Sequence, residues 1–265
     1  MIHNHEIDYS IFGEEMQYVE VELDYNETAI AEPGAFMMME DGIVMETMFG
    51  DGSQQQNSSL LGKLLNAGKR VLVGESLFMT AFTNINQGKR RVSFASPYPG
   101  KIIPIDLSSL DNNVICQKDA FLCAAKGVSI GIEFQRKLGS GLFGGEGFIM
   151  ERLQGDGMAF LHAGGHVFQK QLNAGEILKI DTGCIVGFTA GVQYDIQFVG
   201  GIKNTLFGGE GLFFAKLTGP GIVWIQTLPI SRLAGRILQY STTTRKEEGS
   251  ILGGIGNLLD GDGKW

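Results

Sequence analysis

The chain has 265 residues, of which 43% are hydrophobic and 19% charged, and it carries a net charge of −8. This balance supplies a large core and excludes an intrinsically disordered protein. The acidic surplus also argues against a general nucleic-acid binder, because phosphate contacts need clustered Lys and Arg. The short basic run at Lys89–Arg91 is typical of a solvated hairpin. We therefore expect no nucleic-acid partner.

The first strand-like segment alternates apolar and polar residues. Val19, Val21 and Leu23 stand at every second position, and a period of two predicts a half-buried β-strand. An alternating run, a polar turn and a second strand-like run follow one another at residues 18–39, 102–123 and 166–187. Strands at short spacing with glycine turns, and no long helical pattern, predict an all-β fold.

A glycine-rich segment recurs along the chain. Leu-Phe-Gly-Gly-Glu-Gly occurs at 142–147 and, letter for letter, at 206–211, with a fainter copy at 73–78. Similarity at a fixed spacing indicates internal repeats. We predict one globular domain in which three β-rich units pack around a pseudo-threefold axis and share a core. The units are residues 16–97, with a loop insertion at 49–61, then 98–164 and 165–229, followed by a C-terminal extension at 230–265.

Each unit offers one glutamate at the same place, namely Glu75, Glu146 and Glu210. Three equivalent carboxylates near a shared axis are candidate ligands for a cation. The simpler interpretation, which we favour, is a β-bulge whose glycines supply the backbone angles while the glutamate faces solvent.

Two histidines, His162 and His166, flank a short Ala-Gly-Gly segment. Imidazole is a common metal ligand, so both are candidate metal ligands. The third unit has Gln226 in place of His162, which favours ordinary packed or exposed histidines instead. The spacing of residues shows no Ser-His-Asp, Cys-His or paired-carboxylate grouping, so we expect no catalytic residues, no cofactor and no enzyme activity.

The methionines Met37–Met39, Met45 and Met48 fit either an adaptable partner surface or a strand core, and we expect about half of them in the core. The tail at Ile251–Trp265 has apolar residues at helical spacing. A short helix that caps one end of the molecule and an anchor on a membrane surface both fit it. We favour the cap, because the apolar stripe carries little positive charge.

The ends and the cysteines of the chain bear on its compartment. The N-terminus lacks the charged and apolar regions of a secretory signal, and no apolar stretch is long enough for a membrane span. Cys123 and Cys184 lie in apolar runs and are expected to be buried free thiols, which suits a reducing cytosol. We expect a cytoplasmic protein.

At its Gly-Glu segments, and over roughly Tyr18–Thr242, the chain resembles a family of uncharacterised bacterial and archaeal proteins. These are related to the fungal mitochondrial-biogenesis factor named for altered inheritance of mitochondria. The resemblance implies a fold like that of the tryptophan RNA-binding attenuation protein (TRAP-like), triplicated, with a short double-stranded β-helix in each unit. It implies no catalytic residues, and a shared fold does not license RNA or tryptophan binding.

These observations predict a non-enzymatic β-rich scaffold or interaction protein. Open strand edges favour self-association, so we expect a homo-oligomer or a protein partner. The alternative is a small-molecule or metal-binding β-helix module with possible enzyme activity. A third hypothesis is attachment to a membrane surface through the C-terminal tail.

Overall fold

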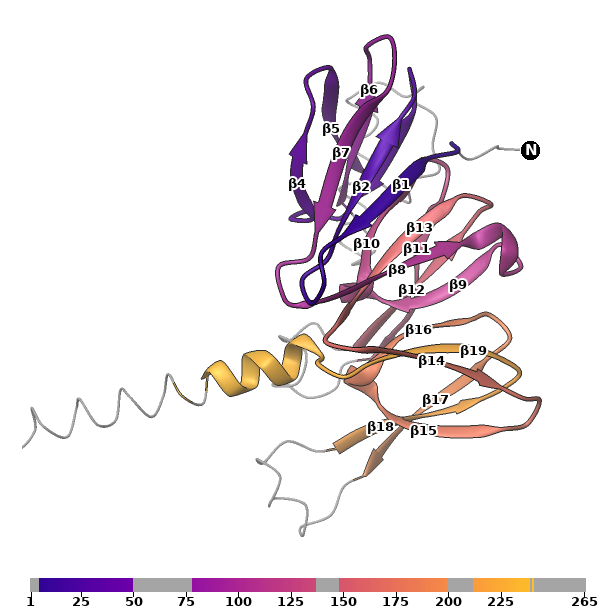
Figure 1. The fold of residues 1–265 in the computed structure, drawn as a ribbon. Coiled ribbons are helices and arrows are strands. Elements are labelled where there is room, and N and C mark those ends of the chain that lie inside the picture. The colour runs from indigo at the N-terminus through magenta and orange to yellow at the C-terminus, as the bar shows by residue number, and fades with distance from the viewer. Residues whose placement is uncertain (1–4, 50–77, 137–147, 200–211, 239, 241–265) are drawn as a thin grey trace, which may run out of the picture.

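The computed structural model describes residues 5–49, 78–136, 148–199, 212–238 and 240. Nineteen strands in these residues form four antiparallel sheets, which we call A to D (Figure 1). Residues 230–238 are helical. The predicted all-β fold is therefore confirmed.

The order of strands in each sheet follows. Sheet A is β1 (Asp8–Phe12), β2 (Tyr18–Leu23), β7 (Arg90–Ala95) and β4 (Phe36–Met39). Sheet B is β5 (Ile43–Phe49), β6 (Phe78–Asn84), β3 (Thr28–Ala31), β10 (Phe121–Ala125), β13 (Met158–Gly164) and β8 (Gly100–Asp106). Sheet C is β11 (Ser129–Arg136), β12 (Phe148–Gln154), β9 (Asn113–Gln117), β16 (Ile185–Thr189), β19 (Gly221–Gln226) and β14 (Val167–Leu172). Sheet D is β15 (Ile177–Asp181), β18 (Leu212–Thr218) and β17 (Gln193–Val199). Three short 3-10 turns join strands: η1 (Leu107–Ser109), η2 (Lys118–Ala120) and η3 (Thr182–Cys184).

The four sheets are stacked in the order A, B, C, D, with sheets A and D at the two ends of the molecule (Figure 1). An apolar cluster fills each of the three interfaces. Phe94 and Phe160 lie between sheets A and B, Leu153 and Leu161 between B and C, and Phe188 between C and D with its neighbours from sheet D. Burial of these side chains is the main favourable term holding the layers together.

Position in the stack explains the burial pattern of each strand. In sheet A, β2 alternates between half-buried and buried residues, as its period of two predicts for a strand with one face in the core. In sheet B, which is covered on both faces, every residue of β3 and β10 is buried. Ala and other small apolar residues dominate these two strands because the neighbouring layers approach from both sides.

The described residues do not pack around a pseudo-threefold axis with one shared core. Sheets A and D remain separate, and the core consists of three clusters instead of one. The physical reason is that each inner sheet already uses both of its faces for packing, so the layers extend in a line. The methionine expectation was also wrong, since Met37, Met38, Met39 and Met45 are exposed and Met48 alone packs against the core.

Several predicted features lie outside the described residues. These are Glu75, Glu146, Glu210, most of the insertion at 49–61, and the tail at 251–265. Among the residues that the structure describes, no helix is both long enough and apolar enough to cross a membrane. Cys123 is a buried free thiol as expected, whereas Cys184 is only partly buried.

Candidate functional site

The two predicted histidines do not come together as a metal site. His162 on β13 is only 2% exposed, and its ring lies edge-on to Tyr98 with 4.5 Å between ring centroids. Burial lowers the pKa of His162 to about 4, so the ring is neutral at pH 7. His166 is exposed, and its backbone N–H donates to the Thr227 hydroxyl at 2.9 Å. Over the described ranges, no group of three or more His, Cys, Asp and Glu residues could hold a metal ion.

The residue that replaces His162 in the third unit has a clear structural role. Gln226 is 5% exposed; its Oε1 accepts the Gly164 N–H at 2.8 Å, and its Nε2 donates to the Gly183 carbonyl at 2.9 Å. It therefore joins the end of β13 to the η3 turn. By contrast, Nδ1 of His162 is buried without a hydrogen-bond partner in the described part of the chain. The difference between these two positions is one of packing and hydrogen bonding.

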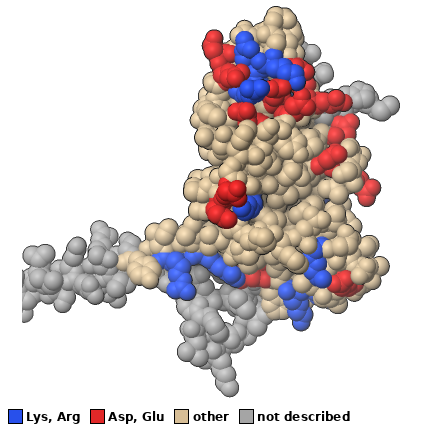
Figure 2. Space-filling view, viewed as in Figure 1, with Lys and Arg blue, Asp and Glu red and all other residues tan. Residues whose placement is uncertain are grey.

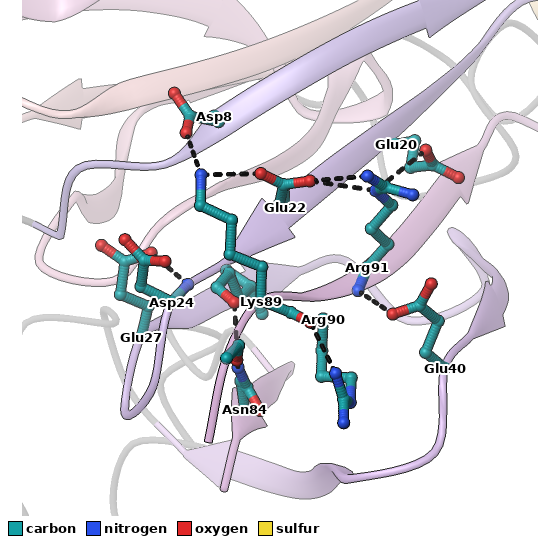
Figure 3. A network of polar contacts seen from close by, with 12 residues as sticks. Asp8, Glu20, Glu22, Asp24, Glu27, Glu40, Asn84, Lys89, Arg90 and Arg91 are labelled. Carbon is teal, nitrogen blue, oxygen red and sulfur yellow. Dashed lines mark hydrogen bonds and ion pairs between the residues drawn. The ribbon is translucent and has the colours of Figure 1, made fainter. Parts of the chain in front are cut away.

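The basic run Lys89–Arg91 lies on the outer face of sheet A, where Lys89 and Arg91 pair with carboxylates and Arg90 donates to backbone carbonyls (Figures 2 and 3). Glu22 bridges two of its members, at 2.7 Å from Lys89 Nζ and 2.8 Å from Arg91 Nη2. These hydrogen bonds, first to Lys89 and then to Arg91, lower the pKa of Glu22. Asp8 also contacts Lys89 at 3.0 Å. The run is thus part of an exposed ion-pair network.

A buried carboxyl group and a half-buried one near it were not anticipated from the sequence. Glu151 on β12 is 3% exposed, although a strand core rarely contains an acid. Burial, followed by the charge of Glu32, raises its pKa to about 8. Glu32 follows β3, and burial together with the charge of Asp119 raises its pKa to about 7. Both groups therefore titrate near neutral pH, and each makes the other harder to ionise.

This carboxyl pair lies where the chain passes between sheets B and C. The Glu32 N–H donates to the Leu122 carbonyl at 3.1 Å, and Glu151 lies opposite Cys116 across the β12–β9 ladder. The sequence contained one signal for this pair: the residue of the third unit that corresponds to Glu151 is the apolar Ala215. The pair can bind and release protons, but no third His, Cys, Asp or Glu among the described residues joins it to form a metal site.

An open depression of about 580 Å³ lies near the described N-terminal end. Its lining includes His5 and the acidic residues Glu6, Glu27 and Asp106. The Nδ1 atom of His5 already accepts the Thr28 N–H at 2.9 Å, so it is not free to act as a ligand. The depression has an acidic rim but no organised group of ligands.

The most unusual surface is strand β4 at one edge of sheet A. All four of its residues are exposed: Phe36 by 41%, Met37 by 49%, Met38 by 43% and Met39 by 40%. No described strand pairs with its outer edge. Strands at sheet edges carry unpaired N–H and C=O groups, which are a template for another strand. We call this strand with its free backbone edge the β4 edge.

The β4 edge combines two kinds of binding capacity. The backbone offers hydrogen bonds, and the thioether and phenyl side chains offer an adaptable apolar surface. The sequence contained the relevant signal in its run of methionines, but that signal did not reveal whether the strand is inside a sheet or at its edge. The fold answers this question.

Comparisons with known proteins agree with the fold. The chain is 27% identical over 230 residues to an uncharacterised protein of Streptococcus pyogenes serotype M6, covering 85% of this chain and 87% of that protein. It also superposes on the X-ray crystal structure of a Streptococcus pyogenes protein with a TM-score of 0.68. That match covers 89% of this chain and all of the other at 21% identity, and it shows the fold alone. The model of the mitochondrial biogenesis AIM24 family matches residues 9–228, and the chain therefore belongs to this family.

Proposed function

We propose that this protein is a non-enzymatic β-rich scaffold that binds protein partners through the β4 edge. The observation that carries the proposal is the exposure of four consecutive apolar residues on a strand that has no outer neighbour among the described strands. Contiguous exposed apolar surface on a soluble protein marks an interaction site. Addition of a partner strand to an open edge is a common way to bind an extended peptide.

We propose further that the scaffold consists of three copies of one six-stranded unit, at residues 16–97, 98–164 and 165–229. The pairing of strands supports this. In each unit the sixth strand pairs with the first and third, and the fifth strand pairs with the second and fourth. This alternation between two layers is in keeping with a short double-stranded β-helix of the TRAP-like type. Each unit thus contributes three strands to one sheet and three to the next.

The absence of enzyme activity and the cytoplasmic location are parts of the same proposal. The buried ionisable groups that we find, Glu151 and His162, face the core and have no access for a substrate. The buried free thiols of Cys116 and Cys123 suit a reducing compartment.

A photocrosslinking experiment in cells tests the proposed function. A benzophenone side chain is placed at position 38 on β4, and in a control at position 168 on β14, where Phe168 is 52% exposed on another edge strand. We expect discrete protein adducts from position 38 and far fewer from position 168. Equal yields at both positions, or no adduct from position 38, would contradict the proposal.

A further inference from the structure

The four sheets have eight edge strands among the described residues, and five of them are edges for the same reason. These five (β5, β8, β11, β14 and β17) are the first or fourth strand of a unit. The first strand of unit 1, β2, would be a sixth, but the added strand β1 pairs outside it and takes the edge of sheet A. The remaining two edges are β4 and β15. Strand β4 is the third strand of unit 1, and β15 is the second strand of unit 3. The third and second strands of the other units lie inside a sheet.

The chain uses one kind of contact twice to join its units. The second strand of one unit pairs antiparallel with the third strand of the next, as β3 with β10 and as β9 with β16. All residues of β3 and β10 are buried by this contact and by the neighbouring layers, whereas every residue of β4 is exposed. Strand β4, the third strand of unit 1, and β15, the second strand of unit 3, are therefore the two halves of the same contact, and no other described strand pairs with either of them at this edge.

A shared irregularity fixes how the third strands correspond. Each has a register shift at the same point of its ladder: between Phe36 and Met38 in β4, between Phe121 and Cys123 in β10, and between Ile185 and Gly187 in β16. Met38 therefore corresponds to Cys123 and to Gly187. Since bulges are specific features of a strand and not defects, this correspondence is a firm guide to register.

We infer that the β4 edge of one copy pairs antiparallel with β15 of a second copy, in the register used inside the chain. This inference rests on the proposed function and names its partner. Cys123 lies opposite Ala31, and Gly187 lies opposite Cys116. The corresponding pair between copies is Met38 with Ile180, followed by Met39 with Lys179.

The two edges also complement each other in composition and charge. In this register Ile177, which is 53% exposed, lies diagonal to Met39 of β4 on the same face of the joined sheet. Lys179 of β15 lies opposite Lys216 of β18 in the strand register, whereas the acidic residues Glu40 and Asp41 follow β4. In the proposed register Lys179 is diagonal to Asp41, and this contact between opposite charges favours the antiparallel orientation, whereas Glu176 and Asp181 of the same region are already paired with Lys170 and Arg232.

A chain cannot make this contact with itself, because β4 and β15 lie at opposite ends of the stack (Figure 1). The contact is head to tail, so it leads to a ring or to an open filament. Pairing joins the three strands of sheet D in one copy to sheet A of the next. The resulting order β2-β7-β4-β15-β18-β17 is the order of sheet B, in which β8-β13-β10 is followed by β3-β6-β5.

Engineered disulfides test the inference and its register in the full-length chain. Met39→Cys is made in one preparation and Lys179→Cys in another, both with Cys184→Ser to remove the partly buried native thiol. We expect a covalent dimer, of twice the 28.7 kDa of one chain, when the two are mixed under mild oxidation, and little dimer in either alone. Phe168→Cys mixed with Lys179→Cys is the matched control and should give no dimer.

A second variant tests the native contact without cysteines. The Glu40 N–H donates to the Arg91 carbonyl within sheet A, so the alternation of the strand directs the Met39 N–H to the open edge. Met39→Pro removes that donor at a site where an edge strand accepts proline. In sedimentation velocity, the mass of the native chain should rise with concentration toward twofold or more, while Met39→Pro stays at the mass of one chain with an unchanged circular dichroism spectrum.

The outcomes separate the two proposals. A native chain that stays monomeric, together with mixed cysteine variants that do not crosslink, would overturn the pairing with a second copy. Adducts with another protein from position 38 would then still support the proposed function. Crosslinking of Met39→Cys with itself would instead show two β4 edges meeting each other and would overturn the head-to-tail arrangement.

Discussion

Replacing Glu151 by Gln is expected to stabilise the protein, and more strongly as the pH rises. Glu151 is buried in β12, and its pKa is raised from 4.5 to about 8, first by burial and then by Glu32. A raised pKa in the folded state means that the stability contributed by the protonated carboxyl is complete below about 4.5 and is lost as the pH rises toward about 8. Gln has the shape of a protonated Glu and cannot ionise.

The size of the effect follows from the two pKa values. A difference of one pH unit corresponds to about 1.4 kcal/mol. With the folded pKa near 8, ionisation of the unfolded chain favours unfolding by about 1 kcal/mol at pH 5 and by about 3 kcal/mol at pH 7. The free energy of unfolding of Glu151→Gln should therefore exceed that of the native chain by a margin that grows by about 2 kcal/mol between these pH values. Removing the carboxyl of residue 151 also removes its repulsion with Glu32, which adds to the stabilisation at higher pH.

Urea unfolding at pH 5, 6, 7 and 8 measures this margin. Glu133→Gln is the matched control: Glu133 accepts a hydrogen bond from Arg152 Nε at 2.6 Å, which lowers its pKa. Loss of the Glu133 carboxylate should therefore destabilise the protein at neutral pH and have a smaller effect in acid. A margin for Glu151→Gln that is the same at pH 5 and pH 7 would refute the reasoning, because it would show that Glu151 ionises as readily in the folded chain as in the unfolded one.

Three further predictions concern stability. Gln226→Leu should lower the free energy of unfolding by about 1–3 kcal/mol in urea, because it leaves the Gly164 N–H and the Gly183 carbonyl buried without their partner. The native chain should lose thermal stability as the pH falls from 6.5 toward 4, because the pKa of folded His162 is about 4, and His162→Gln should flatten this dependence. Arg91→Ala should change the free energy of unfolding only slightly, with the difference shrinking in high salt, because its ion pairs are exposed.

The strands of this fold could be predicted because their signal is local. The alternation of Val19, Val21 and Leu23 reports a strand with one buried face, and β2 has that form. The stacking of sheets could not be predicted in the same way. It depends on pairing between segments far apart in the chain, such as β3 with β10, and no local period reports which strand lies beside which.

The same limit applies to the candidate site. A run of apolar residues such as Phe36–Met39 fits a strand buried on both faces as well as a bare edge, because both need β-forming apolar side chains. Glu151 stood in a run of apolar residues, and only the layers on both sides of β12 show that its carboxyl is buried. The histidines attracted attention as metal ligands, but one is packed against Tyr98 and the other faces solvent.

The composition of the edges themselves argues that β4 is built to be covered. Natural sheets protect their edges with charged residues or proline, which disfavour the addition of another strand. Six of the other described edge strands have such a residue: Asp8 in β1, Glu46 in β5, Pro104 in β8, Glu133 in β11, Lys170 in β14 and Asp195 in β17. Strand β15 has Lys179, which in the proposed pairing lies diagonal to Asp41 after β4 and therefore meets an opposite charge. Strand β4 alone among these edges has none. The composition Phe-Met-Met-Met in β4 therefore supports the proposal that this edge is covered by a partner, because an unprotected edge without one would expose the protein to aggregation.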